Sequence, residues 1–149
     1  MPRVAHLFRA PKRGWPMEEA PALAAVQDLG FQGCAHRRPG GKRQVLLMDR
    51  ETLDVLELSP GTIRENITTE GLNVNGLKPG ETLRIGKAVL EVTIACTPCG
   101  QIEALRPGLR KAIRGRRGMF CRVVEHGIIR QGDTIEKVVR VMDSVCDVA

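Results

Sequence analysis

Two cysteines three positions apart mark the part of the chain where residue types and spacing suggest chemistry. Residues 94–102 read Ile-Ala-Cys-Thr-Pro-Cys-Gly-Gln-Ile, with Cys96 and Cys99 on either side of Pro98. The proline removes a backbone donor, and the run from residue 82 to residue 93 before the pair has strand character. A strand end can hold a reactive group at a fixed exposed position. We therefore expect one of these two cysteines to be the reactive group.

The spacing of the pair favours a single activated thiolate. A structural zinc site wants four ligands, and a thioredoxin-like motif needs a helix that opens at the first cysteine. Residues 98–100 indicate no such helix. A thiolate favoured by nearby arginines could bind a soft metal or carry sulfur. A small zinc protein stays an alternative, although the remaining candidate ligands lack paired spacing: Cys34, His36, Cys121, His126 and Cys146.

The other cysteines predict no disulfide framework. The chain has five cysteines, an odd number, and in a reducing cytosol such residues are buried, reactive or metal-binding. We expect Cys121 and Cys146 to pack as small buried hydrophobic residues.

A loop rich in glycine and base could bind an anion. Residues 31–43 include Gly40, Gly41, Lys42 and Arg43, and successive glycines with cationic side chains can wrap an anion. We expect the loop to line a pocket. A solvated basic loop is the alternative, and His36 alone does not decide between them.

Positive charge indicates anionic partners. The net charge is +6 and the pI about 9.4, which favours phosphate, a charged cofactor or nucleic acid. The most basic stretch, residues 106–117, predicts a short helix that opens at Pro107 and carries Arg110 and Arg114 on one face; a solvated charged helix is the alternative. Three Phe, one Trp and no Tyr offer little for base stacking, so a nucleic-acid-binding module is the weaker reading.

The elements that position these groups are mainly strands. Patterning predicts strands at residues 4–8, 44–48, 82–85, 88–93, 119–125 and 134–141, with the last in a final hairpin. Asp49 suits the N-cap of a helix over residues 50–58. Residues 20–29 are ambiguous, and Asn66 could hold a turn or face a ligand. The pattern predicts a mainly β fold, a barrel or partly closed sheet with a few short helices.

Length and hydropathy predict one cytoplasmic domain over residues 1–149. The chain length suits one core. No apolar run approaches the ~18 residues that span a bilayer, so we expect no membrane association. The N-terminal residues lack the apolar stretch of a secretory signal.

Several motifs in order resemble a MOSC domain, the family named for the C-terminal domain of molybdenum cofactor sulfurase. They are Gly-Cys-Ala-His at residues 33–36, Arg-Gln-Val at 43–45, Arg-Glu-Asn-Ile at 64–67, Leu-Arg-Ile-Gly at 83–86, Cys-Thr-Pro-Cys at 96–99, then Gly118, Val123, and Gly-Asp at 132–133. No single motif is specific, but their order and spacing are. The resemblance runs over residues 4–139, and the chain is similar in size to the small stand-alone bacterial members.

The resemblance implies a barrel-like β fold with a cysteine that carries sulfur or ligates molybdenum. That cysteine maps best onto Cys99, as catalytic residue and metal ligand, with Cys96 the second choice and His36 a catalytic partner. The cofactor would be molybdopterin. Its anionic phosphate would contact Arg43, Asn66, Gly40, Gly41, Lys42 and Arg117. The family members imply a molybdenum-dependent reductase of N-hydroxylated compounds or a sulfur transferase, and the family is also associated with pyridoxal phosphate.

The chain departs from the family pattern at one point. The family usually has Gly-Asp-X-His where this chain has Gly33, Cys34, Ala35 and His36. The missing carboxylate implies either lost or altered catalysis, or a second sulfur from Cys34 in the pocket. We expect neither a separate N-terminal β-barrel domain nor a pyridoxal-phosphate-dependent desulfurase domain in this chain. A cysteine desulfurase or an electron-donor protein would then supply sulfur or electrons.

Overall fold

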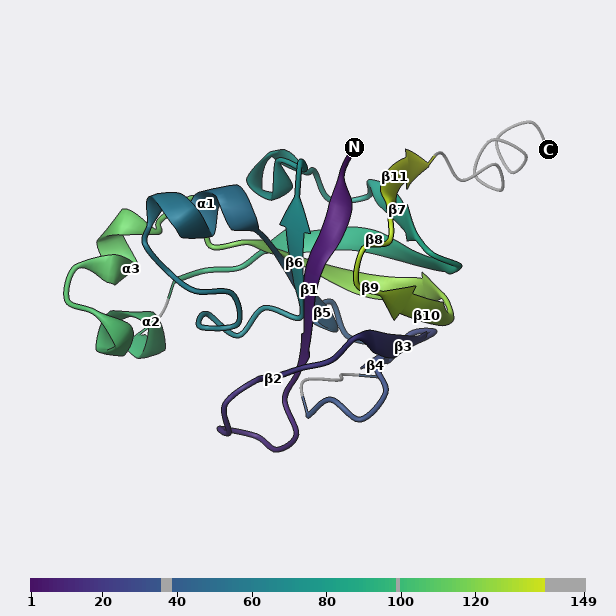
Figure 1. Cartoon of the computed structure of the whole chain (residues 1–149), viewed down its shortest axis with the longest axis horizontal. Helices are drawn as coiled ribbons and strands as arrows, with labels where there is room; N and C mark the ends of the chain where they lie inside the picture. The colour runs from purple at the N-terminus through teal and green to yellow at the C-terminus, as the bar shows by residue number, and fades with distance from the viewer. Residues whose placement is uncertain (36–38, 99, 139–149) are drawn as a thin grey trace.

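The computed structural model describes residues 1–35, 39–98 and 100–138, and over these residues the fold is mainly β (Figure 1). His36, Cys99 and Cys146 lie outside the described residues. The larger sheet has the strand order β11-β7-β8-β9-β5-β6-β1-β2, and a smaller one has the order β10-β3-β4. The mainly β prediction is confirmed.

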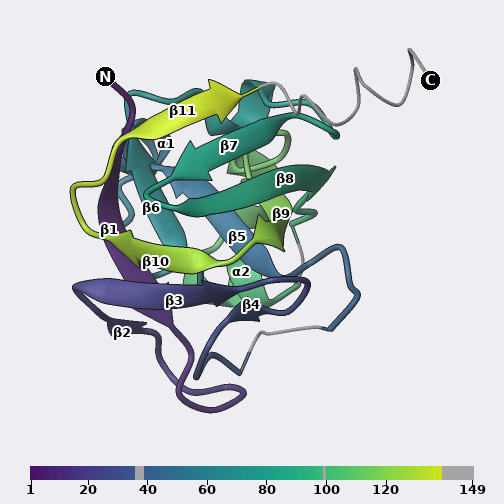
Figure 2. The ribbon, with the colours of Figure 1, turned by 90° about the vertical axis from the view of Figure 1, so that its right-hand side faces the viewer.

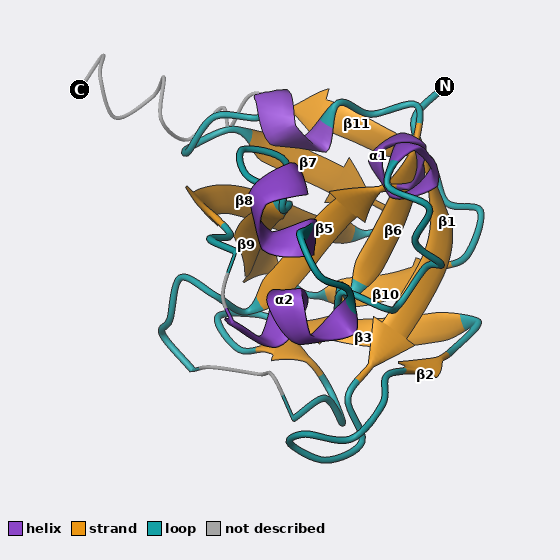
Figure 3. Cartoon of the chain, turned by 90° about the vertical axis from the view of Figure 1, so that its left-hand side faces the viewer, coloured by secondary structure: helices purple, strands orange, loops and turns teal. Residues whose placement is uncertain are grey.

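Short strands make up most of the regular elements, and three short helices and a 3-10 turn lie among them in the described part of the chain. The elements are β1 (Arg3–Arg9), β2 (Glu18–Glu19), β3 (Ala22–Val26), β4 (Gly30–Phe31), β5 (Val45–Asp49), α1 (Arg50–Val55), β6 (Ile67–Glu70), the 3-10 turn η1 (Val74–Gly76), β7 (Thr82–Ile85), β8 (Ala88–Ala95), α2 (Gly100–Leu105), α3 (Leu109–Ala112), β9 (Met119–Glu125), β10 (Gly127–Arg130) and β11 (Ile135–Val138). The helices lie on one side of the strands (Figure 3).

The larger sheet is antiparallel except at one pair. β5 and β6 run parallel, with Leu47 opposite Ile67, and α1 lies between them in the chain. Asp49 caps α1 as predicted, because its side chain accepts a hydrogen bond from the backbone N–H of Thr52 at 2.9 Å. The predicted hairpin of residues 82–93 is also confirmed, as the antiparallel pair β7–β8.

The start of β1 approaches the residues that lead into β11, at the other end of the larger sheet. Over their described residues, the two strands form no continuous ladder. An isolated bridge joins Arg3 to Thr134. The backbone N–H of Val4 donates to the carbonyl of Asp133 at 2.8 Å, and that of Ile135 donates to the carbonyl of Pro2 at 2.9 Å. Figure 2 shows the start of β1 beside the chain that leads into β11. A closed barrel is not found among the described strands, so that part of the prediction is not established.

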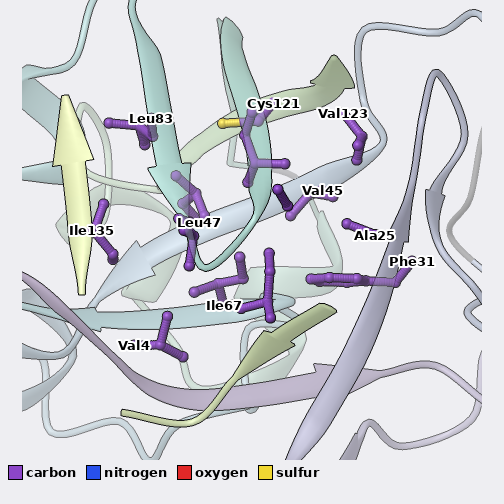
Figure 4. Packing of buried hydrophobic residues seen from close by; sticks show 14 of the residues in the cluster. Val4, Ala25, Phe31, Val45, Leu47, Ile67, Leu83, Cys121, Val123 and Ile135 are labelled. Atoms are coloured by element: carbon purple, nitrogen blue, oxygen red, sulfur yellow. The ribbon is translucent and has the colours of Figure 1, made fainter. Parts of the chain in front are cut away.

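Two apolar clusters hold the elements together. The main one lies between the sheets and includes Leu47, Ile67 and Phe31 (Figure 4). The second packs Met48 of β5 against Leu53 of α1 and residues of α2 and α3. Because successive side chains of a strand point to opposite faces, β5 buries one face in each cluster, which explains its uninterrupted apolar run.

Packing decides two local points that the sequence left open. Residues 20–29 contain a strand, β3, whose residues alternate in burial and pair with both β10 and β4. A short helix that the sequence did not indicate, α2, begins at Gly100, after the cysteine pair, and buries Ile102 in the second cluster. Tertiary contacts outweigh weak local preference in such short elements.

Two predictions for the C-terminal third of the chain are corrected. The basic helix is shorter than expected: α3 begins after the left-handed residue Gly108 and ends before Arg114, so Arg110 and Arg114 share no helical face. The final hairpin is wrong, because β10 pairs with β3 whereas β11 pairs with β7.

Within the described ranges, no helix has the length and apolar character needed to cross a membrane.

Candidate functional site

A pocket of about 260 Å³ opens where the end of β8 and the start of β9 meet the loops before β2 and β6. Leu46 of β5 and Phe120 of β9 contribute to its wall, and Gln101 of α2 stands at its side. The lining residues are Arg13, Ala35, Arg43, Leu46, Arg64, Asn66, Cys96, Gln101, Arg117 and Phe120. Four of these residues are arginines, and no acidic side chain is among the described lining residues. The pocket is therefore suited to an anion.

Arg117 is the most deeply placed of the four arginines. Its exposed fraction is 8%. Nη2 donates to the carbonyl oxygen of Ile63 at 2.9 Å, whereas Nε and Nη1 have no hydrogen-bond partner among the described residues. A buried charged donor left unpaired is costly, at about 1–3 kcal/mol or more. An anion in the pocket would supply the missing acceptors.

Glu65 is buried and lies close enough to Arg117 for electrostatic interaction. Its Oε2 accepts hydrogen bonds from the backbone N–H of Gly61 at 2.9 Å and from Thr68 Oγ1 at 2.8 Å. Burial raises the pKa of Glu65, and these hydrogen bonds and the charge of Arg117 oppose that rise. Glu65 and Arg117 form no ion pair within 4 Å among the described contacts. Glu65 therefore leaves Nε and Nη1 of Arg117 without an ion-pair partner among the described contacts.

Arg64 joins the pocket to the loop before β2. Its φ is +68°, in the left-handed region, which costs a residue with a side chain roughly 1–2 kcal/mol. Nη1 donates to the carbonyl oxygen of Trp15 at 2.7 Å. The same loop carries Arg13 into the pocket lining. Arg64 therefore fixes the position of a loop that supplies a second cation.

Asn66 lines the pocket, but its amide group bonds to the protein. Oδ1 accepts from the backbone N–H of Leu46 at 3.0 Å, and Nδ2 donates to the carbonyl oxygen of Phe8 at 3.3 Å and to Cys34 Sγ at 3.5 Å. The residue is 1% exposed. Its side chain thus connects β1, β5 and the segment that carries Cys34.

Cys34 and Cys121 are both buried away from the pocket lining. Cys34 accepts a hydrogen bond from the backbone N–H of Ala10 at 3.3 Å, in addition to that from Asn66; its neighbour Ala35 reaches the pocket instead. Cys121 is fully buried, as predicted, and burial raises the pKa of its thiol far above the ordinary value. These two thiols act as core residues.

Cys96 is half-buried and lines the pocket. Its backbone N–H donates to the carbonyl oxygen of Gly118 at 2.9 Å, just after β8 and β9 shift register between Val92 and Ala95. Because Gly118 follows Arg117, this hydrogen bond brings the thiol and the buried guanidinium to one pocket.

The structure brings three of the predicted cofactor contacts together and leaves three outside. Arg43, Asn66 and Arg117 line the pocket, and Arg43 lies over the ring of Phe120 at 5.9 Å. The predicted contacts not among the lining residues are Gly40, Gly41 and Lys42. The backbone N–H of Gly40 donates to Asp28, and the carbonyl of Lys42 accepts from Thr93 Oγ1.

Sequence reasoning missed Arg13, Arg64, Gln101 and Phe120 as lining residues. Arg64 could have been found, because it opens the Arg-Glu-Asn-Ile motif at residues 64–67, which contains the predicted contact Asn66. Nothing local distinguished Arg13 from other loop cations.

A family comparison agrees with this geometry. The model of the MOSC domain matches residues 35–136, more than half of the 149 residues. The chain belongs to the MOSC domain family. Every lining residue of the pocket except Arg13 falls inside the matched MOSC range.

Solved structures share this MOSC fold. The YuaD protein from Bacillus subtilis has a TM-score of 0.79 at 20% identity, over 94% of this chain and 98% of that chain. YiiM from Geobacillus stearothermophilus has a TM-score of 0.78 at 19% identity, over 94% and 76%. YiiM from Escherichia coli has a TM-score of 0.70 at 19% identity, over 93% and 70%. No curated protein matches the sequence. Identities this low support the fold alone.

Proposed function

We propose that this MOSC protein binds an anionic cofactor in the arginine pocket and uses a pocket cysteine as metal ligand or sulfur carrier. The observation that carries the proposal is Arg117, a buried guanidinium whose nitrogens Nε and Nη1 have no hydrogen-bond partner among the described residues. The family resemblance favours the molybdenum cofactor as the occupant. When bound, that cofactor would supply two-electron redox chemistry at molybdenum.

The residues of the pocket fit the phosphate end of such a cofactor. Arginine offers planar pairs of donors that match phosphate oxygens, and Arg43, Arg64 and Arg117 contribute such groups. The pocket volume, about 260 Å³, lies below the ~300–1,000 Å³ typical for drug-sized ligands. The pocket would thus hold the anionic end and leave the remainder of the cofactor at its mouth.

Two cysteines are candidates for the metal ligand or sulfur carrier. The family resemblance favours Cys99, which lies outside the described residues, with His36 as its partner. Cys96 is the thiol that lines the described pocket. A reductase would need an electron-donor protein, and a sulfur carrier would need a sulfur donor such as a cysteine desulfurase. These partners, and the cytoplasmic location, stay predictions.

The alternative functions have less support in the fold. Among the described residues, no group of three or more His, Cys, Asp or Glu side chains could hold a metal ion. For a nucleic-acid module the relevant residues are those of the basic stretch. There Arg117 lines the pocket, and Arg106 and Arg116 donate to the carbonyl oxygens of Leu56 and Ala112. The buried Arg117 is therefore removed from the surface that a nucleic acid would contact. A gel shift at low salt tests that reading.

The test of the proposal is cofactor loading. The wild type would be expressed in a host that makes molybdenum cofactor, and molybdenum, zinc and pterin fluorescence would be measured. Cys99→Ser, Cys96→Ser and Arg43→Gln would be compared with Arg122→Gln, which removes a surface cation paired with Glu91. We expect molybdenum and pterin in the wild type and in Arg122→Gln, with loss in Arg43→Gln and in one cysteine variant. Absence of both from the wild type, or equal loading in all variants, would overturn the proposal.

A further inference from the structure

We propose that Cys96 accepts sulfur directly from a small sulfane-sulfur oxyanion, of which thiosulfate is the simplest, bound among the pocket arginines. The inference rests on the sulfur-carrier form of the proposed function and names a sulfur source for it. It also assigns the sulfur-accepting role to Cys96 rather than to Cys99.

Solvent access distinguishes Cys96 from the other described cysteines. Among the described cysteines, Cys34 and Cys121 are 1% and 0% exposed and line no part of the pocket. Cys96 is half-buried and lines it. Attack on sulfur requires an accessible thiolate. Cys96 alone among these three meets the requirement of access.

The charge and the size of the pocket favour a small anion. Four arginines line a volume of about 260 Å³ without a described carboxylate in the lining. A space this small with that much positive charge favours a compact, multiply charged anion. Arg117 adds an independent sign of a ligand, because it is buried and its Nε and Nη1 have no described partner. The three oxygens of a sulfonate-like group are suitable acceptors for such donors.

Cys96 and Arg117 line the same pocket, so the thiol and a bound anion would lie close together. The backbone of Cys96 is bonded to Gly118, the residue after Arg117. An anion held by Arg117 therefore shares one pocket with the Cys96 sulfur. Holding both reactants in one site converts an encounter in solution into a reaction within a complex. This positioning lowers the activation barrier of the transfer.

The chemistry balances without an external oxidant or reductant. The Cys96 thiolate attacks the outer sulfur of thiosulfate and forms a new S–S bond. The S–S bond of thiosulfate breaks, and its electron pair leaves with sulfite. The terminal sulfur of the Cys96 persulfide is then attacked by an acceptor nucleophile, a thiolate or, as a laboratory probe, cyanide. That step returns the Cys96 thiolate and yields an acceptor persulfide or thiocyanate.

The test is a single turnover of the purified whole chain with thiosulfate. Released sulfite is measured, the intact mass reports one added sulfur atom, and cyanide then converts that sulfur to thiocyanate. We expect stoichiometric sulfite and thiocyanate from the wild type and from Cys99→Ser, and neither from Cys96→Ser. Arg43→Gln and Arg64→Gln should need about tenfold more thiosulfate, because each removes a charge-assisted hydrogen bond. Arg122→Gln, a surface cation outside the pocket, should behave as the wild type.

Two results would overturn the inference. One is sulfite release by Cys96→Ser at the wild-type rate, or its loss in Cys99→Ser but not in Cys96→Ser. The other is no sulfite from a wild type that binds inorganic phosphate in the pocket or loads molybdenum and pterin. In that second case the proposed function stands and the sulfur source fails. If neither anion binds, both fail together.

Discussion

The backbone N–H of Cys96 donates to the carbonyl oxygen of Gly118 at 2.9 Å. This hydrogen bond joins the residue after β8 to the residue before β9, next to the pair Ala95–Met119 and beyond the register shift that begins at Val92. Cys96, at the end of β8, and Arg117, just before β9, line the same pocket.

Gly118 should tolerate no side chain. Its φ is +109°, and a Cβ there would lie 2.4 Å from the carbonyl oxygen of Leu47. Gly118→Ala should lower the free energy of unfolding by at least about 2 kcal/mol, through backbone strain and the clash. Gly115→Ala is a matched control, because Gly115 has φ +80° with nothing near its Cβ position. Urea unfolding measures both; equal losses would show that the contact with Leu47 has no role.

Trp15 should report anion binding. It is the single tryptophan of a chain without tyrosine, and its carbonyl oxygen accepts a hydrogen bond from Arg64, which lines the pocket. Titration with inorganic phosphate should change the tryptophan emission of the wild type and of Arg122→Gln. Arg64→Gln should weaken the response about tenfold or more in phosphate concentration. An identical titration curve for Arg64→Gln would show that Arg64 does not take part in anion binding.

Asn66 should be a structural residue of the pocket wall. Replacing it by alanine leaves the backbone N–H of Leu46 and the carbonyl of Phe8 without the partners described above, at a cost of about 2–4 kcal/mol. Asn73→Ala should change stability by less than about 0.5 kcal/mol, because Asn73 is exposed and its side chain makes no cap hydrogen bond. Chemical denaturation compares the two variants. A loss below about 1 kcal/mol for Asn66→Ala would mean that water replaces its bonds.

Glu65 should make stability fall as the pH rises. Burial raises its pKa above the ordinary value of 4.5, so between the unfolded and the folded pKa the native state holds more protons than the unfolded state. The stabilising contribution is present below pH 4.5 and is lost as the pH rises through the folded pKa of Glu65. Unfolding free energies over a pH series should decline less in Glu65→Gln than in the wild type. Parallel pH profiles would contradict the burial effect.

Much of the fold could be predicted because local pattern and burial agree. Residues 82–93 alternate apolar and polar side chains around Gly86 and form the hairpin β7–β8. Prediction failed where packing between distant segments decides the state. Residues 22–26 have helix-forming alanines, yet they extend because β10 and β4 pair on both sides. Gly100–Leu105 becomes a helix because Ile102 completes the second cluster.

The candidate site shows the same division. By itself the sequence determined the mainly β class, the MOSC resemblance, the cap at Asp49 and the surplus of cations. The tertiary structure decided that Arg117 is buried beside the pocket while Arg116 bonds to Ala112. It also decided that Cys96 lines the pocket while Cys34 lies behind Asn66. Neighbouring residues of one type differ in this way because burial depends on strand register and long-range hydrogen bonds, which a local pattern does not encode.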